Sequence, residues 1–310
     1  MQLFDRPSAT PRVAARPARA GAFDLRGHSQ HADRAFRWIA LGAAAVVLVV
    51  LALIAITMTD RARPVLGRMG LGFFTTTTWS VPTNTYGALG FIFGTLYTAA
   101  IAIAIAVPIS FGVALFVTQA APRRLRKPLV YAIDLLAVVP SVVFGLWGLL
   151  VMAPALGLQS SFLTAGVILA IMITPIITSL SREVIETTPT TDKEAALALG
   201  ATRWEMINAS VLPHSKGGLV GAVMLGLGRA MGETIAAALV IGSALGQITF
   251  NPFASGNSMP AVIANEWGEA DGPHKAALIA LAVTLFVITI GVNLAATAIV
   301  QRSMKRSRGV

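Results

Sequence analysis

The sequence predicts an all-α membrane protein with six transmembrane helices and both termini in the cytoplasm, and three observations lead to that fold class. Of the 310 residues, 55% are hydrophobic and only 12% are charged, against roughly a quarter charged in ordinary soluble domains. The mean hydropathy of the chain is +0.73. Long uncharged segments recur along the chain, each bounded by charged or turn-forming residues. This pattern is typical of one multi-span membrane domain and disfavours two soluble domains.

Six segments are apolar and long enough to cross a bilayer. A transmembrane helix needs about 20 mainly apolar residues, and the segments cover residues 38–58, 88–117, 129–152, 162–180, 218–245 and 276–300. The second segment is long enough to include a tilted or interfacial first turn. We therefore expect a single six-span domain at 36–301, embedded in the lipid bilayer.

The positive charges set the orientation of these spans. Of the 24 Lys and Arg residues, 19 lie before the first span, in the 118–128 and 182–217 loops, or after the last span. Loops rich in Lys and Arg stay in the cytoplasm, so both termini are predicted to be cytoplasmic. The net charge of +10 then reflects topology and attraction to anionic lipids. No aromatic residues interleave with the arginines, so no nucleic acid partner is expected.

The two ends of the chain differ from the spans between them. Residues 1–35 are rich in Arg, Pro and Ala and lack periodic hydrophobicity, which predicts a disordered cytoplasmic tail. The apolar segment that follows is too long for the core of a signal peptide, so we interpret it as a span of the mature protein. Residues 302–310 are predicted to form a basic cytoplasmic tail.

The residue types exclude several kinds of chemistry. The chain has no cysteine, which removes disulfides, thiolate nucleophiles and Cys-ligated metals. The four histidines lack metal-ligand spacing and are His28, His31, His214 and His274. We expect no metal and no cofactor on this chain. An intramembrane enzyme is disfavoured, because no Ser/His/Asp-like set gathers at one depth.

The cytoplasmic loop at 182–217 contains a predicted short helix from Asp192 to Leu199. Thr191 or Asp192 can cap its first turn, and Gly200 can end it in the left-handed conformation. The small side chains of Ala195 and Ala196 allow this helix to approach another surface closely. A soluble partner on the cytoplasmic side best explains such a helix.

This loop resembles the EAA loop of ABC importer permeases, whose pattern is Glu-Ala-Ala, three residues, Gly, nine residues, Ile, one residue and Leu-Pro. The matching positions are Glu194, Ala195, Ala196 and Gly200, followed by Leu-Pro at 212–213. Ser210 stands where the pattern has Ile. The resemblance implies a coupling helix that inserts into a groove of a separate ATPase subunit. ATP and Mg are expected on that partner, since the chain lacks a GxxxxGK string followed by Ser or Thr.

Three ionisable residues, Asp134, Arg229 and Glu233, lie inside the predicted spans, where charges are costly. Counted from the cytoplasmic start of the fifth span, Arg229 lies about 17 Å and Glu233 about 23 Å along the helix. Ser141 and Thr174, each beside a proline, fall at about 17–18 Å along their own spans. We expect a polar chamber at the bilayer centre, where Arg229 binds an anion and Ser141 and Thr174 add hydrogen bonds. Asp134 is shallower, which favours an interfacial or interhelical hydrogen bond.

The segment 226–234, Gly-Leu-Gly-Arg-Ala-Met-Gly-Glu-Thr, resembles the G-R-A-x-G-E-T segment of phosphate (Pst) importer permeases. Together with residues 139–148, it is most similar to the PstC type, and the resemblance covers most of residues 38–300. It implies a type I ABC importer permease (MetI-like) fold in a bacterial cytoplasmic membrane, with Arg229 and Glu233 used in phosphate movement. The implied partners are a sister permease (PstA-like), an ATPase dimer (PstB-like) and an extracytoplasmic phosphate-binding protein (PstS-like).

Two interpretations of Glu233 remain open. Glu233 pairs with Arg229 four residues earlier, although Arg before Glu is the less favourable order on a helix. Alternatively, it accepts a hydrogen bond from protonated phosphate, which sulfate cannot donate. A permease for sulfate, molybdate or a phosphonate remains a second hypothesis, and a stand-alone anion channel is a less favoured third.

Overall fold

The computed structural model describes the backbone of residues 29–307 and the side chains of residues 34–298. Most of the predicted 1–35 tail and the last three residues of the predicted 302–310 tail therefore lie outside the described residues. The chain divides into two units, one ending at Leu53 and one beginning at Ile54. The described part of the first unit is the beginning of helix α1 (Ser29–Met69), which starts before the predicted domain boundary at residue 36. The second unit carries every candidate site residue.

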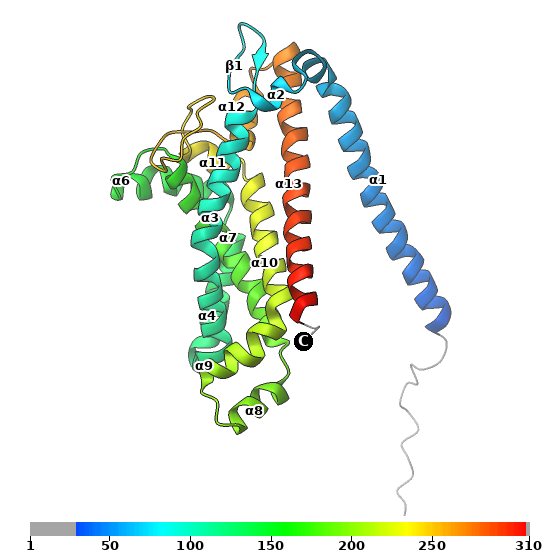
Figure 1. Cartoon of the computed structure of the whole chain (residues 1–310), viewed down its shortest axis with the longest axis vertical. Helices are drawn as coiled ribbons and strands as arrows, with labels where there is room; N and C mark the ends of the chain where they lie inside the picture. Colours follow the sequence, from blue (N-terminus) through cyan, green and yellow to red (C-terminus); the bar gives the residue numbers. More distant parts are fainter. Residues whose placement is uncertain (1–28, 308–310) are drawn as a thin grey trace, which may run out of the picture. The chain divides into compact units, whose positions relative to one another are not determined.

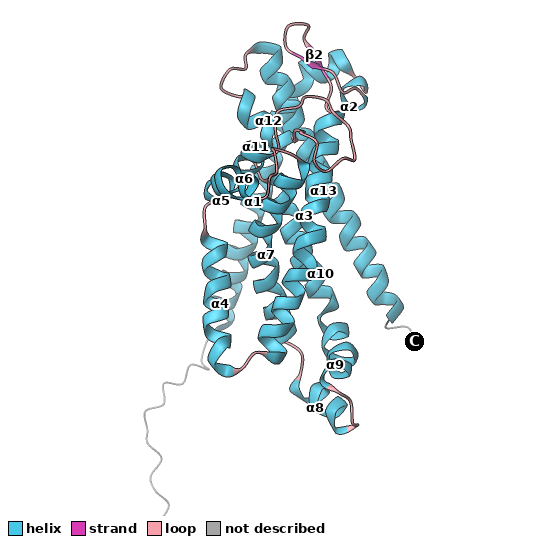
Figure 2. Cartoon of the chain, turned by 90° about the vertical axis from the view of Figure 1, so that its left-hand side faces the viewer, coloured by secondary structure: helices cyan, strands magenta, loops and turns pink. Residues whose placement is uncertain are grey.

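The second unit is almost entirely helical (Figures 1 and 2). After α1 come α2 (Gly72–Thr75), strands β1 (Trp79–Ser80) and β2 (Thr85–Tyr86), α3 (Leu89–Leu115) with the π-helical turn η1 (Phe116–Ala120), and α4 (Arg123–Val138). Then follow α5 (Ser141–Trp147), the π-helical turn η2 (Gly148–Met152), α6 (Ala153–Ala155), α7 (Phe162–Glu186), α8 (Thr190–Ala198) and α9 (Arg203–Met206). The chain continues with the π-helical turn η3 (Ile207–Val211), α10 (Leu212–Gly232), α11 (Ile235–Val240), α12 (Met259–Glu266) and α13 (Gly272–Ser307).

Within the described residues, four helices are long and apolar enough to cross a membrane: Arg34–Met69, Leu89–Ala120, Phe162–Glu186 and Gly272–Ala298. A fifth candidate is the pair of segments Arg123–Val138 and Ser141–Ala155, which meet at an angle of 91°. Val139 at the bend is extended, with ψ 128, because Pro140 disfavours a helical conformation in the residue before it. The predicted 129–152 span is therefore a broken one.

The predicted 218–245 span is also not one continuous helix. Helix α10 ends at Gly232, Glu233 is extended with ψ 124, and the short helix α11 begins at Ile235. The expectation of an uninterrupted fifth helix through Arg229 and Glu233 was wrong. Non-helical backbone at such depth is tolerated where protein or a watery cavity satisfies its polar groups.

Parallel helices α3 and α7 pack along most of their length, and α10 packs on α7. Small residues let these helices approach closely. A Cβ added to Gly166 on α7 would lie 2.4 Å from Cγ2 of Ile101, and one added to Gly226 on α10 would lie 2.6 Å from Cδ1 of Ile177. Both glycines are therefore required by packing, and α7 is the central helix on which the candidate site is assembled.

The two ends of this bundle carry different structures (Figures 1 and 2). At one end, β1 and β2 form an antiparallel hairpin that pairs Trp79 with Tyr86. Glu266 of α12 accepts hydrogen bonds from Nε1 of Trp79 at 2.9 Å and from Nε2 of His274 at 2.7 Å. This buried polar cluster joins the hairpin to α12 and α13. Helices α8 and α9 lie at the opposite end of the bundle.

Candidate functional site

The predicted loop helix is present as α8, Thr190–Ala198. Neither Thr191 nor Asp192 caps it, since the N-cap residue is Pro189 and makes no side-chain cap. Its end is as expected: Gly200 has φ +87, and backbone bonds run from Gly200 N to Leu197 O at 3.0 Å and from Ala201 N to Ala196 O at 3.2 Å. A left-handed glycine thus fixes where α8 stops.

Helix α8 has one anchored face and one free face. Ala196 packs against the buried cluster of Ile185, Met206 and Val211, whereas Glu194, Ala195 and Gly200 are exposed. Contact with this chain is therefore made through Ala196, and the other three residues of the EAA pattern face outward.

The sequence analysis missed two large exposed apolar side chains beside α8. Leu199 is 90% exposed and Trp204 is 63% exposed. Large apolar side chains exposed close together on a protein surface are typical of sites that bind another molecule. The sequence alone could have identified both, because each is a large apolar residue among charged and small residues of the loop.

The backbone that follows α8 is held by local hydrogen bonds. In a capping box, Thr202 N donates to Oε2 of Glu205 at 2.7 Å and Glu205 N donates to Oγ1 of Thr202 at 3.3 Å. The hydrogen bonds from the backbone N–H and then the hydroxyl of Thr202 lower the pKa of Glu205. Ser210, at the Ile position of the EAA pattern, donates from Oγ to the carbonyl of Asp192 at 3.3 Å. A hydrogen bond to α8 therefore replaces the apolar contact that the pattern predicts.

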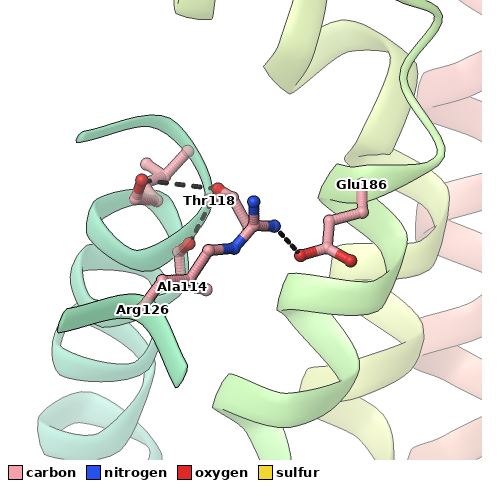
Figure 3. Close-up of polar contacts among 5 residues, drawn as sticks. Ala114, Thr118, Arg126 and Glu186 are labelled. Atoms are coloured by element: carbon pink, nitrogen blue, oxygen red, sulfur yellow. Dashed lines mark hydrogen bonds and ion pairs between the residues drawn. The ribbon is translucent and has the colours of Figure 1, made fainter. Parts of the chain in front are cut away.

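An ion pair joins α4 to the end of α7, the helix that precedes α8 (Figure 3). Arg126, in the first turn of α4, pairs with Glu186, the last residue of α7, and their side chains are 44% and 41% exposed. Nearby, Thr118 donates from its hydroxyl to the carbonyl of Ala114 at 2.8 Å. The Arg126–Glu186 pair joins the two candidate spans that precede α8.

Arg229 lies near the end of α10 and is exposed in the single chain. It makes no hydrogen bond or ion pair with any other residue among those the structure describes. The predicted pairing with Glu233 at i,i+4 is therefore absent, because the helix ends at Gly232 and Glu233 is extended. The guanidinium is available for a ligand or for a residue of another subunit.

Glu233 instead caps the next helix. Its Oε1 accepts a hydrogen bond from the backbone N–H of Ala236 at 3.3 Å, in the first turn of α11. A carboxylate is favourable at a helix N-terminus. The side chain is half-buried and its other oxygen has no partner among residues 34–298. Glu233 thus has a structural contact and retains capacity to accept a second hydrogen bond.

Ser141 and Thr174 belong to α5 and α7. Ser141 is the first residue of α5, immediately after Pro140. Thr174 donates from Oγ1 to the carbonyl of Ala170 at 2.7 Å, so its proton is already used within its own helix. Over the described side chains, no hydrogen bond joins Ser141, Thr174, Arg229 and Glu233 to one another. The four predicted site residues are not linked in this single chain.

Asp134 has the interhelical contact that its depth predicts. Ser179 of α7 lies with Oγ 3.5 Å from Oδ1 of Asp134 on α4. This is the outer limit of a hydrogen bond. The contact connects the same two helices as the Arg126–Glu186 ion pair.

Residues 110–305 match the family described as binding-protein-dependent transport system inner membrane components. The chain is 41% identical to the phosphate transport system permease protein PstC of Xylella fastidiosa (strain 9a5c), over 88% of this chain and 91% of that protein. It is 38% identical to PstC 2 of Mycobacterium tuberculosis, over 93% of this chain and 94% of that protein.

Two solved structures share the fold at low sequence identity. A chain of a bacterial alginate ABC transporter superposes with a TM-score of 0.62 and 16% identity, over 90% of this chain and 99% of that chain. A chain of the inward-facing MetNI methionine ABC transporter superposes with a TM-score of 0.59 and 17% identity, over 72% of this chain and 99% of that chain.

Proposed function

The chain belongs to the family of binding-protein-dependent transport system inner membrane components and, within it, to the phosphate permeases of the PstC type, and from this premise we propose how it moves inorganic phosphate. It is the membrane permease of an ATP-driven importer and is not itself an enzyme. The observation that carries this assignment is identity of about 40% to phosphate permeases across almost the whole chain.

We propose that the chain crosses the bacterial cytoplasmic membrane six times, in a MetI-like arrangement with both termini in the cytoplasm. The four continuous helices and the bent α4–α5 pair supply five crossings. The interrupted α10–α11 segment supplies the sixth. An even number of crossings agrees with the placement of the Lys- and Arg-rich segments on one side.

Arg229 is proposed to bind the phosphate during its passage. A guanidinium presents planar paired donors that suit an oxyanion, and no carboxylate lies within ion-pair distance of Arg229 in the described residues. Ser141 and Thr174 would offer further hydrogen bonds when the spans rearrange. Glu233 would accept a hydrogen bond from the P–OH of phosphate with the oxygen that does not cap α11, a contact that sulfate cannot provide.

Coupling to ATP hydrolysis is proposed to run through α8. The exposed Glu194, Ala195 and Gly200, with the apolar Leu199 and Trp204, form a surface that would insert into a groove of the ATPase dimer, where ATP and Mg bind. Ala196 anchors the helix to the permease. Movement of the ATPase dimer would then be transmitted through α8 to α7 and α10, the helices that precede and follow this loop.

The remaining partners follow from the same proposal. A sister permease would cover the face of α10 that carries Arg229, and an extracytoplasmic binding protein would deliver phosphate to the end formed by the hairpin and α12. The transport cycle alternates outward-open and inward-open forms. Release requires that Arg229 binds phosphate more weakly in the inward-open form. If the affinity were equal in both forms, the conformational change would not promote release.

Uptake of radiolabelled phosphate tests this function. A strain without other phosphate uptake systems, carrying the complete importer, should take up phosphate, and excess unlabelled sulfate, molybdate or phosphonate should not compete. Competition by one of these anions at equal concentration would favour the second hypothesis for the cargo. Passive phosphate conduction by the purified permease in liposomes, without the ATPase, would instead support a channel.

A further inference from the structure

Asn293 of α13 is a polar side chain beside the part of α10 that carries Arg229, and the proposed function does not use it. Between residues 276 and 298, Asn293 is the one amide or charged side chain in the sequence, and it lies within the candidate span Gly272–Ala298. A carboxamide in an apolar span costs free energy unless it is hydrogen-bonded. The side-chain amide of Asn293 has no hydrogen-bond partner among the residues whose side chains are described.

The packing of α10 on α13 places this amide beside the Arg229 turn. A Cβ added to Gly228 would lie 3.8 Å from Nδ2 of Asn293, with no other atom within 4 Å. The amide of Asn293 therefore lies beside Gly228, the residue that directly precedes Arg229.

The face of α10 that carries Arg229 is open between its contacts with α7 and α13. Gly226 faces Ile177 of α7, and Gly228 faces Asn293. At 3.6 residues per turn, Arg229 lies about 60° around the helix from Gly226 and about 100° from Gly228. Added Cβ atoms at Gly221 and Gly232, on the same side of the helix, would meet nothing within 4 Å. An anion on Arg229 would thus have Asn293 at the α13 border of this open face.

We propose that Asn293 is a further substrate-contact residue, which hydrogen-bonds the phosphate held by Arg229. The amide carries both donors and an acceptor. It can therefore donate from Nδ2 to a phosphate oxygen and accept a hydrogen bond from P–OH at Oδ1, whereas sulfate at neutral pH offers acceptors alone. Asn293 would contribute to discrimination between the two anions, alongside the free oxygen of Glu233. This inference rests on the proposed phosphate function.

The test compares three variants of the complete importer for phosphate uptake and for inhibition by sulfate. Asn293→Leu keeps the branched shape and removes all side-chain hydrogen bonding, and Asn293→Ser restores a smaller donor and acceptor. Thr297→Val is the matched control, since Thr297 is exposed one turn away and its hydroxyl already donates to the carbonyl of Asn293 at 2.8 Å. Co-purification of the ATPase subunits measures assembly.

We expect Asn293→Leu to raise the KM for phosphate about tenfold, the effect of losing one hydrogen bond to a charged ligand. Sulfate should become a better inhibitor relative to phosphate, Asn293→Ser should recover part of the KM, and Thr297→Val should behave as the unmodified chain. A KM and a sulfate inhibition unchanged in Asn293→Leu would overturn the inference. So would loss of assembly in both Asn293 variants, which would assign the amide to packing. Absence of phosphate uptake by the unmodified importer would instead refute the proposed function.

Discussion

Arg126 and Glu186 form an ion pair that joins the first turn of α4 to the last residue of α7, shortly before α8 begins (Figure 3). Helix α4 is one arm of the broken span, and α7 is the central helix of the bundle. The same helices meet again where Ser179 contacts Asp134. A displacement of α8 would therefore act on the bent α4–α5 segment through α7.

Reversal of one charge in this pair should weaken coupling, and reversal of both should restore it. Exposed ion pairs contribute about 0.2–1 kcal/mol, so Arg126→Glu should lower phosphate-stimulated ATP turnover by at most about fivefold. Glu186→Arg should act alike, and the double variant Arg126→Glu, Glu186→Arg should recover most of the loss. ATPase assays on the purified complex measure all four forms. Effects of the single variants that merely add in the double variant would show that the pair carries no coupling.

Replacement of Gly200 should disturb the end of α8 and hence the docking of the ATPase. Its φ of +87 is strained for residues with a Cβ, at about 1–2 kcal/mol, although an added Cβ would meet nothing within 4 Å. Gly200→Val should reduce co-purification of the ATPase and uptake several-fold, whereas Gly200→Asn should be milder because Asn tolerates this conformation. Gly268→Ala is the control, since its Cβ also has open space and its φ is ordinary. If Gly200→Val and Gly268→Ala had the same co-purification and uptake, the left-handed conformation of Gly200 would not be needed for docking.

The capping box after α8 should weaken in acid. Hydrogen bonds from Thr202 lower the pKa of Glu205 from its ordinary value of 4.5. A lowered pKa in the folded state means that the stabilisation is present above the unfolded value and is lost as the pH falls through the folded value. The protection of the amides of residues 202–206 against hydrogen exchange, measured relative to the unfolded chain at each pH, should therefore fall below about pH 4.5. In Glu205→Gln this acid-dependent loss of protection should disappear, and its persistence there would assign the change to another group.

The loop helix could be predicted because its signals are local. The expected range 192–199 overlaps α8 at Thr190–Ala198, and a glycine that allows positive φ marks its end in any context. The capping prediction failed because Pro189 precedes the helix. The hydrogen bond of Ser210 could not be predicted either. The sequence shows that Ser210 departs from the EAA pattern, but not that its hydroxyl donates to the carbonyl of Asp192.

The interior of the candidate site was less accessible to sequence reasoning. A proline lies beside each of Ser141 and Thr174, but α4 and α5 separate at Pro140 whereas α7 continues through Pro175. The α10–α11 break falls at Glu233, where no proline stands. At this break Ala236 N donates to Glu233 three residues earlier, a local cap that the apolar pattern of the segment does not predict. The arithmetic of helical rise therefore placed Arg229 on a helix correctly and Glu233 incorrectly.

Arg229→Lys and Arg229→Ala should separate charge from geometry at the proposed phosphate contact. Lysine keeps the positive charge but loses the planar paired donors, so we expect a KM for phosphate about tenfold higher, equivalent to about 1.4 kcal/mol. Arg229→Ala should abolish measurable uptake while the ATPase subunits still co-purify. Leu225→Ala is the matched control, because Leu225 lies one turn earlier on the same open face and is 62% exposed. If Arg229→Ala transported normally, the guanidinium would have no part in transport, and if it failed to assemble, Arg229 would be a structural contact to the sister permease.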